Sequence, residues 1–261
     1  MKYAAAQHVG KRELQEDFCG LRHGDTLTLM QGAVPVEGEV KDALCCVLAD
    51  GMGGHEAGEI ASRLVGEGFL VSAVCSGTPE NAAGFLPRCA SSLNSQLRAF
   101  VEQNPDCDGM GTTLVGARID KQVLRWVSVG DSHLYLLRGS ALHKLNDDHS
   151  MKPAIDAMVE QGIISQDEAD DHPDRNALRS AIMGRELSLV DVEANGVKLQ
   201  RGDIVLLASD GLDTLSDAVV TKLMRRWKML HPKWLVSALL RSVKAAKSTV
   251  QDNVSVIAIS V

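Results

Sequence analysis

The sequence predicts an α+β fold of four layers, in which two antiparallel sheets lie between two pairs of helices. Two pairs of amphipathic helical segments carry this prediction, 56–75 with 83–103 and 216–229 with 232–247. Short runs of strand-forming residues separated by tight turns occupy much of the remaining chain, as in antiparallel sheets. Helices that are apolar on one face must pack against a sheet, so we expect each pair to cover one outer face.

The N-terminal half supplies one buried strand and the first helix pair. Residues 43–49 form a continuous apolar run that ends at Asp50, which is typical of a buried strand. In 56–75 and 83–103 the apolar residues recur every three or four positions, and Asn104-Pro105 ends the second helix.

The rest of the chain supplies the other strands and the second helix pair. Four short strands joined by tight turns predict one meander: 112–119, 122–129, 133–138 and 141–145. A further strand pair is predicted around a turn at 200–202: 188–197 and 203–208. After the second helix pair, residues 254–261 alternate apolar and small polar residues and predict a closing strand.

A single domain, 1–261, is predicted because no change in composition marks a linker. One irregular segment, 148–185, interrupts the succession of strands and is rich in charged and structure-breaking residues. We interpret it as a surface flap of the same domain.

The composition excludes several classes of protein. A net charge of −7 argues against nucleic acid as a partner. The first ten residues lack the apolar segment of a secretion signal, and no stretch approaches the 18 apolar residues of a membrane span. The six cysteines form no CxxC pair and are predicted to be reduced core residues. We therefore expect a cytoplasmic protein.

Acidic residues recur at the ends of the strand-like runs. Five such positions occur: Glu16-Asp17, Asp50-Gly51, Asp131, Asp210-Gly211 and Asp252. One Asp-Gly pair alone is typical of a turn, but several at separate strand ends predict a metal site made of oxygen ligands. Carboxylates and carbonyls suit Mg²⁺ or Mn²⁺, and two such ions can activate a shared water and bind a phosphate.

Arg12 is the candidate for binding a phosphate group, because a guanidinium matches phosphate geometry and Asp17 lies five residues away. His55 follows the glycines after Asp50 and could approach the site, although a lone loop histidine is more often a surface residue. Other phosphate and acyl-transfer chemistries lack their motifs, since there is no GxxxxGKS/T loop, no GxSxG and no CxxxxxR.

Seven short motifs follow one another along nearly the whole chain: 12–17 (RELQED), 50–54 (DGMGG), 110–113 (MGTT), 129–132 (VGDS), 147–150 (DDHS), 209–212 (SDGL) and 252–255 (DNVS). Each motif is weak alone. In this order they resemble the metal-dependent, or type 2C, serine/threonine protein phosphatases of bacteria. The resemblance implies a sandwich of two antiparallel sheets flanked by helix pairs, which agrees with the layers predicted above.

The resemblance also implies a metal centre of two Mn²⁺ or Mg²⁺ ions. Asp50 would bridge the two ions, and the Gly51 carbonyl would bind one of them. Asp210 and Asp252 would bind the other ion. With Arg12, we expect Asp50 and Asp210 to take part directly in catalysis.

Other family roles fall on residues around this centre. Glu16 and Asp17 resemble the acidic pair that holds metal-bound water. Asp131, together with Asp210, is similar to the pair that binds a third, weaker ion in bacterial members. Arg12 matches the phosphate-binding arginine of the family.

Three positions depart from the family pattern, and none of them removes a metal ligand. Met52 stands where many eukaryotic members have a histidine proposed as general acid, which leaves the proton donor unassigned and agrees with bacterial origin. His133 replaces a common arginine, and Gln15 a common asparagine. Thr113, in the motif near the metal waters, is expected to play a supporting role.

The resemblance thus predicts a serine/threonine protein phosphatase that uses metal-activated water. Its partners would be phosphorylated proteins, including a Ser/Thr kinase and the substrates of that kinase. Two alternatives remain: a catalytically silent phosphoprotein-binding module of the same fold, and a hydrolase of small phosphate esters. The flap at 148–185 would influence substrate choice, unless its charges only solvate it.

Overall fold

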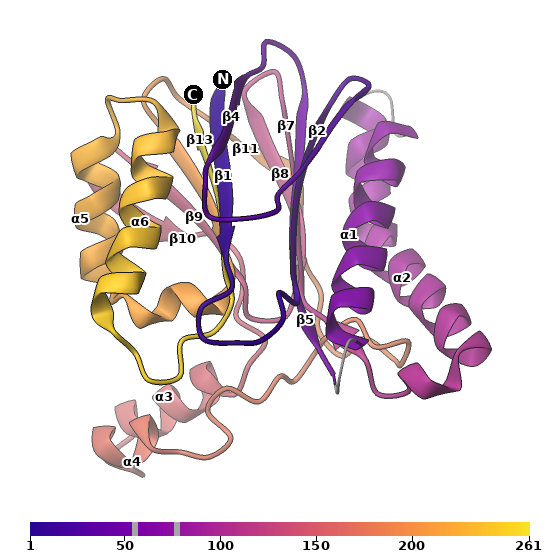
Figure 1. Cartoon of the computed structure of the whole chain (residues 1–261), viewed down its shortest axis with the longest axis vertical. Coiled ribbons are helices and arrows are strands. Elements are labelled where there is room, and N and C mark those ends of the chain that lie inside the picture. The colour runs from indigo at the N-terminus through magenta and orange to yellow at the C-terminus, as the bar shows by residue number, and fades with distance from the viewer. Residues whose placement is uncertain (54–56, 76–78) are drawn as a thin grey trace.

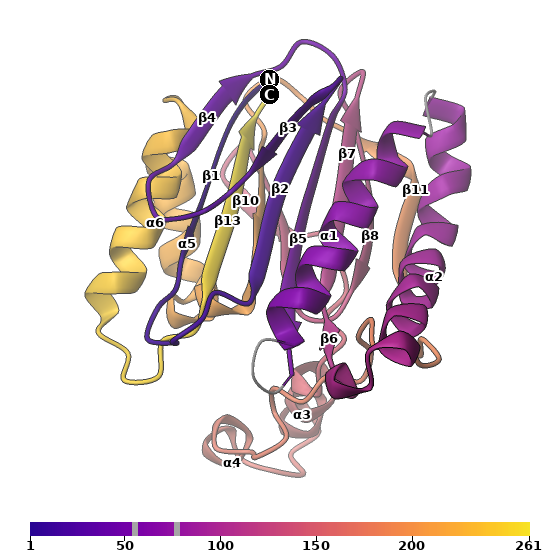
Figure 2. The same ribbon diagram turned by 45° about the vertical axis from the view of Figure 1, so that its right-hand side comes forward.

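The structure is a computed structural model that describes residues 1–53, 57–75 and 79–261. Two antiparallel sheets pack face to face, and a pair of helices covers the outer face of each (Figure 1). The two termini lie together at one end of the sandwich, and the flap lies at the other end (Figures 1 and 2). The predicted four-layer α-β-β-α architecture is confirmed.

The first sheet has six strands and contains both ends of the chain. Its strands, in spatial order, are β10 (Ala141–Lys144), β9 (His133–Arg138), β12 (Ile204–Ala208), β13 (Val254–Ser260), β1 (Lys2–His8) and β4 (Val36–Glu39). The central strand β13 pairs with β1 on one side and with β12 on the other, and both pairs are antiparallel.

The second sheet is built around β5 (Leu44–Met52), which contains the apolar run predicted as a buried strand. Its strands, in spatial order, are β11 (Asp191–Lys198), β8 (Val123–Val129), β7 (Leu114–Asp120), β5, β2 (Asp17–His23) and β3 (Thr26–Leu29). A short strand, β6 (Gly111–Thr112), pairs with the end of β5. Asp17 lies directly opposite Asp50 in the β2–β5 register, so two acidic positions are neighbours across this sheet.

Helices α1 (Ala57–Cys75) and α2 (Pro79–Gln103) cover the second sheet, and α5 (Asp217–Trp227) and α6 (Pro232–Ala246) cover the first (Figure 1). Two single 3₁₀ turns, Pro105–Cys107 and Asp210–Thr214, follow α2 and β12. The flap carries two short helices, α3 (Lys152–Glu160) and α4 (Gln166–Asp170), which project from the sandwich (Figure 2).

Three apolar layers hold the sandwich together. Side chains such as Leu48 and Ile257 fill the space between the sheets, and the other two layers lie between each sheet and its helix pair. Each fully buried leucine or isoleucine stabilises the fold by about 1.5–3 kcal/mol. The neighbours Cys45 and Cys46 enter different layers, as expected for adjacent residues of a strand. Five cysteines are free thiols, and all of these but Cys107 are buried: Cys19, Cys45, Cys46, Cys89 and Cys107.

Two predicted strand pairings are wrong. The four central strands do not form one meander, because β7–β8 belong to the second sheet and β9–β10 to the first. Likewise, β11 pairs with β8, whereas β12 pairs with β9 and β13. Alternating side chains identify a strand but not its partner, and in both places the connecting segment passes from one sheet to the other.

The first 42 residues contribute four strands, β1 to β4, that the apolar runs did not predict. Strand β1 carries the small residues Ala4, Ala5 and Ala6, whose low side-chain volume conceals its burial in the sequence pattern. None of the described helices is long and apolar enough to cross a lipid bilayer.

Candidate active site

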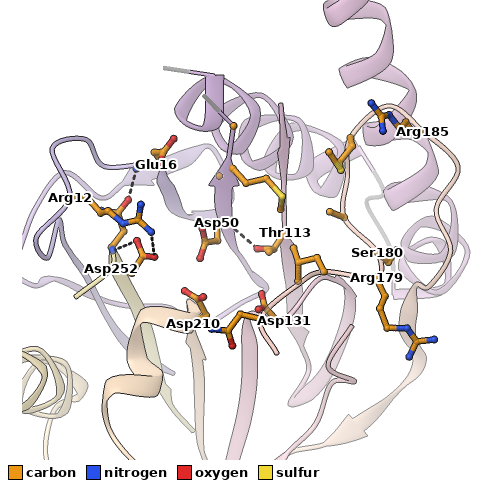
Figure 3. A pocket seen from close by; sticks show the side chains of 18 of the residues that line it. Arg12, Glu16, Asp50, Thr113, Asp131, Arg179, Ser180, Arg185, Asp210 and Asp252 are labelled. Carbon is orange, nitrogen blue, oxygen red and sulfur yellow. Dashed lines mark hydrogen bonds and ion pairs between the residues drawn. The ribbon is translucent and has the colours of Figure 1, made fainter. Parts of the chain in front are cut away.

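A cleft of about 540 Å³ opens where the two sheets end beside the flap (Figure 3). Its two walls have different chemistry. Five acidic side chains at strand ends form the carboxylate wall: Glu16, Asp50, Asp131, Asp210 and Asp252. The C-terminal part of the flap segment together with the next residue, 176–186, forms the opposite wall, and we call it the return wall. The sequence prediction that acidic turns from separate strands meet at one place therefore agrees with the structure.

Asp50 is held in place by hydrogen bonds from the neighbouring Thr112-Thr113 segment. Its backbone N–H donates to Thr113 Oγ1 at 3.0 Å, and its carbonyl accepts from Thr113 N and from Thr112 Oγ1, each at 2.9 Å. Gly51 follows at a point of close backbone approach. A Cβ atom there would lie 2.1 Å from the Gly58 carbonyl oxygen, so only glycine fits at this position of the cleft lining.

Asp210 and Asp252 lie at the ends of the paired strands β12 and β13. Ser209 fixes the first end, since its Oγ accepts from Ser255 N at 2.9 Å. Asn253 fixes the second, because its side chain donates to the Val9 and Leu14 carbonyls and accepts from Glu16 N. The amide of Asn253 thereby ties the Arg12–Asp17 loop to the strand that presents Asp252.

Asp131 reaches the cleft through a tight crossing between the two sheets. The preceding Gly130 has φ 104°, and a Cβ atom there would lie 2.6 Å from Thr113. Its N–H donates to His149 Nδ1 at 3.2 Å, and its carbonyl accepts from His149 N at 3.1 Å. The same crossing that divides the predicted meander therefore positions one of the predicted metal ligands.

Asp17 lies behind the carboxylate wall. It lines a separate cavity of about 590 Å³ beside Phe18 and Cys19, not the cleft itself. Its Oδ2 accepts from Ser209 Oγ at 2.8 Å. Asp17 is thus connected to the strand end that carries Asp210, while Glu16 is the member of the acidic pair that lines the cleft.

The carboxylates raise one another's pKa values. Burial, followed by the charges of Asp210 and Asp252, raises the pKa of Asp17 to about 7. Burial and the charge of Asp210 raise the pKa of Asp131 to about 7. The pKa of Asp50 is raised well above its usual value by burial and by the neighbouring carboxylates, and that of Asp210 is raised by burial and by Asp252.

These carboxylates fit divalent cations that keep part of their hydration shell. Buried oxygens of Glu16, Asp17 and Asp210 have no hydrogen-bond partner in the described parts of the chain. Within those ranges, no group of three or more acidic, histidine or cysteine side chains is placed so that it could hold a metal ion. Mg²⁺ is typically bound by one or two carboxylates and several waters, so the arrangement suits such an ion and not a closed zinc site.

Arg12 lies at the cleft and is paired with a predicted metal ligand. Its Nη2 is 2.6 Å from Asp252 Oδ2 (Figure 3). The two side chains are 55% and 37% exposed, so the ion pair is accessible to water and weak. The guanidinium can therefore exchange this partner for a phosphate group.

A chain of three polar side chains ties the flap to the cleft. Lys152 Nζ of α3 lies 2.5 Å from Asp213 Oδ2, and Asp213 Oδ1 lies 2.7 Å from Nε2 of the buried His133. Although burial opposes it, the hydrogen bond from His133 and the charge of Lys152 lower the pKa of Asp213. Asp213 lies three residues after Asp210.

Several residues of the site did not stand out in the sequence. Ser209, Asn253 and Asp213 hold the strand ends or the flap, and Arg179 and Arg185 lie on the return wall. Ser209 and Asn253 are the sequence neighbours of the predicted ligands Asp210 and Asp252, and this proximity is the one feature of the sequence that could have identified them. Met52 and Thr113 both line the cleft. His55 and Gly54 lie outside the described residues.

Comparison with known proteins supports the assignment. The family described as Protein phosphatase 2C matches residues 19–244, a region that includes Asp50, Asp131 and Asp210. Serine/threonine phosphatase stp of Listeria welshimeri is 36% identical over 65% of this chain and 66% of that protein. The stp protein of Listeria innocua is 32% identical over 81% of this chain and 82% of that protein.

A solved structure agrees over nearly the whole chain. The catalytic domain of serine/threonine protein phosphatase PstP, solved in complex with two manganese ions, superposes with a TM-score of 0.70 at 28% identity. The match covers 98% of this chain and 96% of that chain. Sequence, fold and cleft agree, and the chain belongs to the protein phosphatase 2C family of serine/threonine phosphatases.

Proposed function

We propose that the chain removes phosphate from phosphoserine and phosphothreonine in proteins by direct attack of water on phosphorus. The observation that carries this mechanism is the meeting of five acidic side chains and Arg12 at one cleft, where burial and neighbouring charges raise the pKa values of Asp50 and Asp131. A serine/threonine phosphatase that depends on metal needs both a cation-binding centre and a cation for the phosphate.

Two Mn²⁺ or Mg²⁺ ions fit this centre. Asp50 would hold both ions, with the Gly51 carbonyl on one and Asp210 and Asp252 on the other. Divalent cations held there would lower the pKa of bound water and neutralise charge on the phosphate. The resemblance of the chain to a phosphatase solved with two manganese ions supports a two-ion centre.

The residues around the two ions have supporting roles in this proposal. Glu16 and Asp17 would hold water next to the ions, although Asp17 acts from behind the carboxylate wall. Asp131 and Asp210 would hold a third, weaker ion. The closeness of these two carboxylates supports a site for the third ion. The charge of Asp210 contributes to the raised pKa of Asp131, which shows that the two groups interact.

Arg12 would bind the phosphate by leaving Asp252. A cation held by Asp252 would share the charge of that carboxylate, and the exposed guanidinium would then be free to make two hydrogen bonds to phosphoryl oxygens. The arginine then stabilises charge that develops on the phosphoryl group.

The arrangement of hydroxyl groups favours attack by water over a phosphoenzyme. Thr113 and Ser180 are the hydroxyl-bearing residues among the described lining of the cleft. Thr113 Oγ1 accepts from Asp50 N and shares a hydrogen bond with Ser132, and Ser180 Oγ donates to the Leu189 carbonyl. Both hydroxyl groups are therefore occupied by structural contacts.

We further propose that residues 1–261 act as one catalytic domain of a bacterial signalling protein, with 148–185 as its flap. Its substrates would be cytoplasmic phosphoproteins, among them a Ser/Thr kinase and the targets of that kinase. The serine/threonine phosphatases of Listeria that the chain resembles support this assignment.

Phosphate release from a phosphothreonine peptide tests the proposal. We expect release with Mn²⁺ or Mg²⁺ and its loss when EDTA is added in excess. A panel of small phosphate esters run in parallel separates a protein phosphatase from a general esterase. Release that is unaffected by EDTA would contradict the metal mechanism, and hydrolysis of esters without any hydrolysis of peptides would contradict the protein substrate.

A further inference from the structure

The return wall of the cleft presents two arginine side chains without a hydrogen-bond or ion-pair partner among the described residues. Arg179 and Arg185 both line the cleft and are exposed. Neither side chain has a hydrogen bond or ion pair with any described residue, in contrast to Arg12, which is paired with Asp252. Glu186 is the one acidic side chain among the described lining residues of this wall.

The backbone beneath these arginines is firmly held. The Asn94 side chain accepts from Gly184 N at 2.8 Å and donates to the Arg185 carbonyl at 2.6 Å. Thr112 and Ile182 exchange two backbone hydrogen bonds of 2.9 Å each, and Arg179 N donates to the His149 carbonyl at 2.8 Å. The return wall is therefore a fixed support for two exposed cations.

The two guanidinium groups point in different directions from this support (Figure 3). In this arrangement they do not face a common anion (Figure 3). Each would instead meet a different part of an extended chain that lies across the cleft, while the phosphate occupies the carboxylate wall. The distribution of charge suits a substrate whose phosphorylated residue is flanked by carboxylates.

We propose that Arg179 and Arg185 select phosphoprotein segments that carry acidic side chains close to the phosphorylated residue. This inference rests on the proposed function, because it requires a peptide bound at the same cleft. The protein has a net charge of −7, so attraction by its overall field would favour basic peptides. A preference for acidic peptides would therefore have to come from local contacts with the return wall.

The test compares three phosphothreonine peptides of one length, with aspartate, alanine or lysine flanking the phosphothreonine. For each peptide, kcat/KM is measured with saturating Mn²⁺ for the full chain and for the double variant R179E/R185E. Exposed ion pairs are worth about 0.2–1 kcal/mol each, so two of them give about 2- to 30-fold. We expect the wild type to prefer aspartate to lysine peptides within that range and the double variant to reverse the preference.

The control variant is R201E, which makes a charge change of the same kind at one position. Arg201 is exposed in the turn before β12, at the end of the sandwich that carries the termini. The R201E variant should leave the ratio of kcat/KM between the aspartate and lysine peptides unchanged. A misfolded variant loses activity on all three peptides, whereas a gain on the lysine peptide requires an intact cleft.

The outcomes separate this inference from the proposed function. If the wild type hydrolyses none of the peptides, the proposed function fails. If the wild type hydrolyses all three equally, or if R179E/R185E and R201E change the ratio alike, phosphatase activity stands and the role of the return wall is wrong. A reversal confined to R179E/R185E supports it.

Discussion

The two walls of the cleft are built on different principles. The carboxylate wall consists of strand ends, and hydrogen bonds from Thr113, Ser209 and Asn253 hold its backbone in place. The flap that leads to the return wall is tied to the sandwich by Lys152, whose contact with Asp213 is partly exposed. Repelling carboxylates need a rigid support to stay together. The backbone of the return wall is also held in place, by Asn94 and Thr112, but its arginine side chains are exposed. The two walls therefore differ in the burial and the charge of their side chains.

The largest effect is expected from a change that breaks the carboxylate wall. Asp210→Asn removes a charge that contributes to the raised pKa of both Asp17 and Asp131. If Asp210 is the metal ligand that we propose, its loss should reduce kcat by more than about 100-fold, since bound cations supply several kcal/mol. Phosphate release from a phosphothreonine peptide measures this loss.

The same substitution should leave the fold intact, because it relieves repulsion between buried carboxylates. Circular dichroism and the Tm without divalent cations provide the control, and we expect a Tm that is equal to or higher than that of the wild type. Wild-type kcat for folded Asp210→Asn would remove Asp210 from the metal centre.

The sequence predicted the elements of the fold better than their partners. Helix pairs followed from apolar stripes, and the strands at Leu114–Asp120 and Val123–Val129 followed from runs between turns. Pairing failed where the chain changes sheets at Gly130, because such a crossing looks like any other tight turn in the sequence. The choice of sheet depends on contacts between residues that are distant in the chain.

The two walls of the cleft also differed in how far the sequence predicted them. The acidic residues of the carboxylate wall were predictable because each follows a strand-like run, as at Asp50 and Asp210, and their roles as ligands stay a prediction. The return wall has no such pattern. Arg179 and Arg185 lie in a long irregular segment, and only the contacts of its backbone with Asn94 and Thr112 bring them to the cleft.

The second prediction concerns the charge of the carboxylate wall without cations. Asp17 and Asp131 have pKa values of about 7 in the folded protein, well above the ~3.9 of an unfolded aspartate. Between those values the native state binds more protons than the unfolded chain. The free energy of unfolding should therefore fall as the pH rises from about 4 to about 7.

Thermal unfolding in EDTA at pH 5 and at pH 7.5 measures this effect. We expect a Tm that is lower by at least about 3 °C at the higher pH, and restored there by excess Mn²⁺. Asp131→Asn should reduce the difference, because it removes one of the groups that titrate. A Tm in EDTA that is constant or rises between the two pH values would show that the wall is not strained by its charge.

The smallest effect is expected at the flap, where a substitution should change substrate binding more than the rate of the chemical step. Lys152→Met breaks the contact of α3 with Asp213 and keeps all five side chains of the carboxylate wall, although it removes a positive charge that lowers the pKa of Asp131. If the contact positions the flap over the substrate, KM for a phosphopeptide should rise about two- to fivefold, the range of an exposed ion pair, while kcat changes less. Lys152→Arg keeps the charge and should restore KM.

Lys233→Met is the matched control, since Lys233 pairs with Glu37 at 2.9 Å on a surface formed by α6 and β4. It removes the same type of side chain from a long-range ion pair outside the cleft lining. Equal changes of KM in Lys152→Met and Lys233→Met would show that the contact of Lys152 has no specific role in substrate binding and that any lost surface charge has the same effect. A rise in KM confined to Lys152→Met would instead show that one weak, exposed ion pair adjusts substrate binding while the buried wall retains the chemistry.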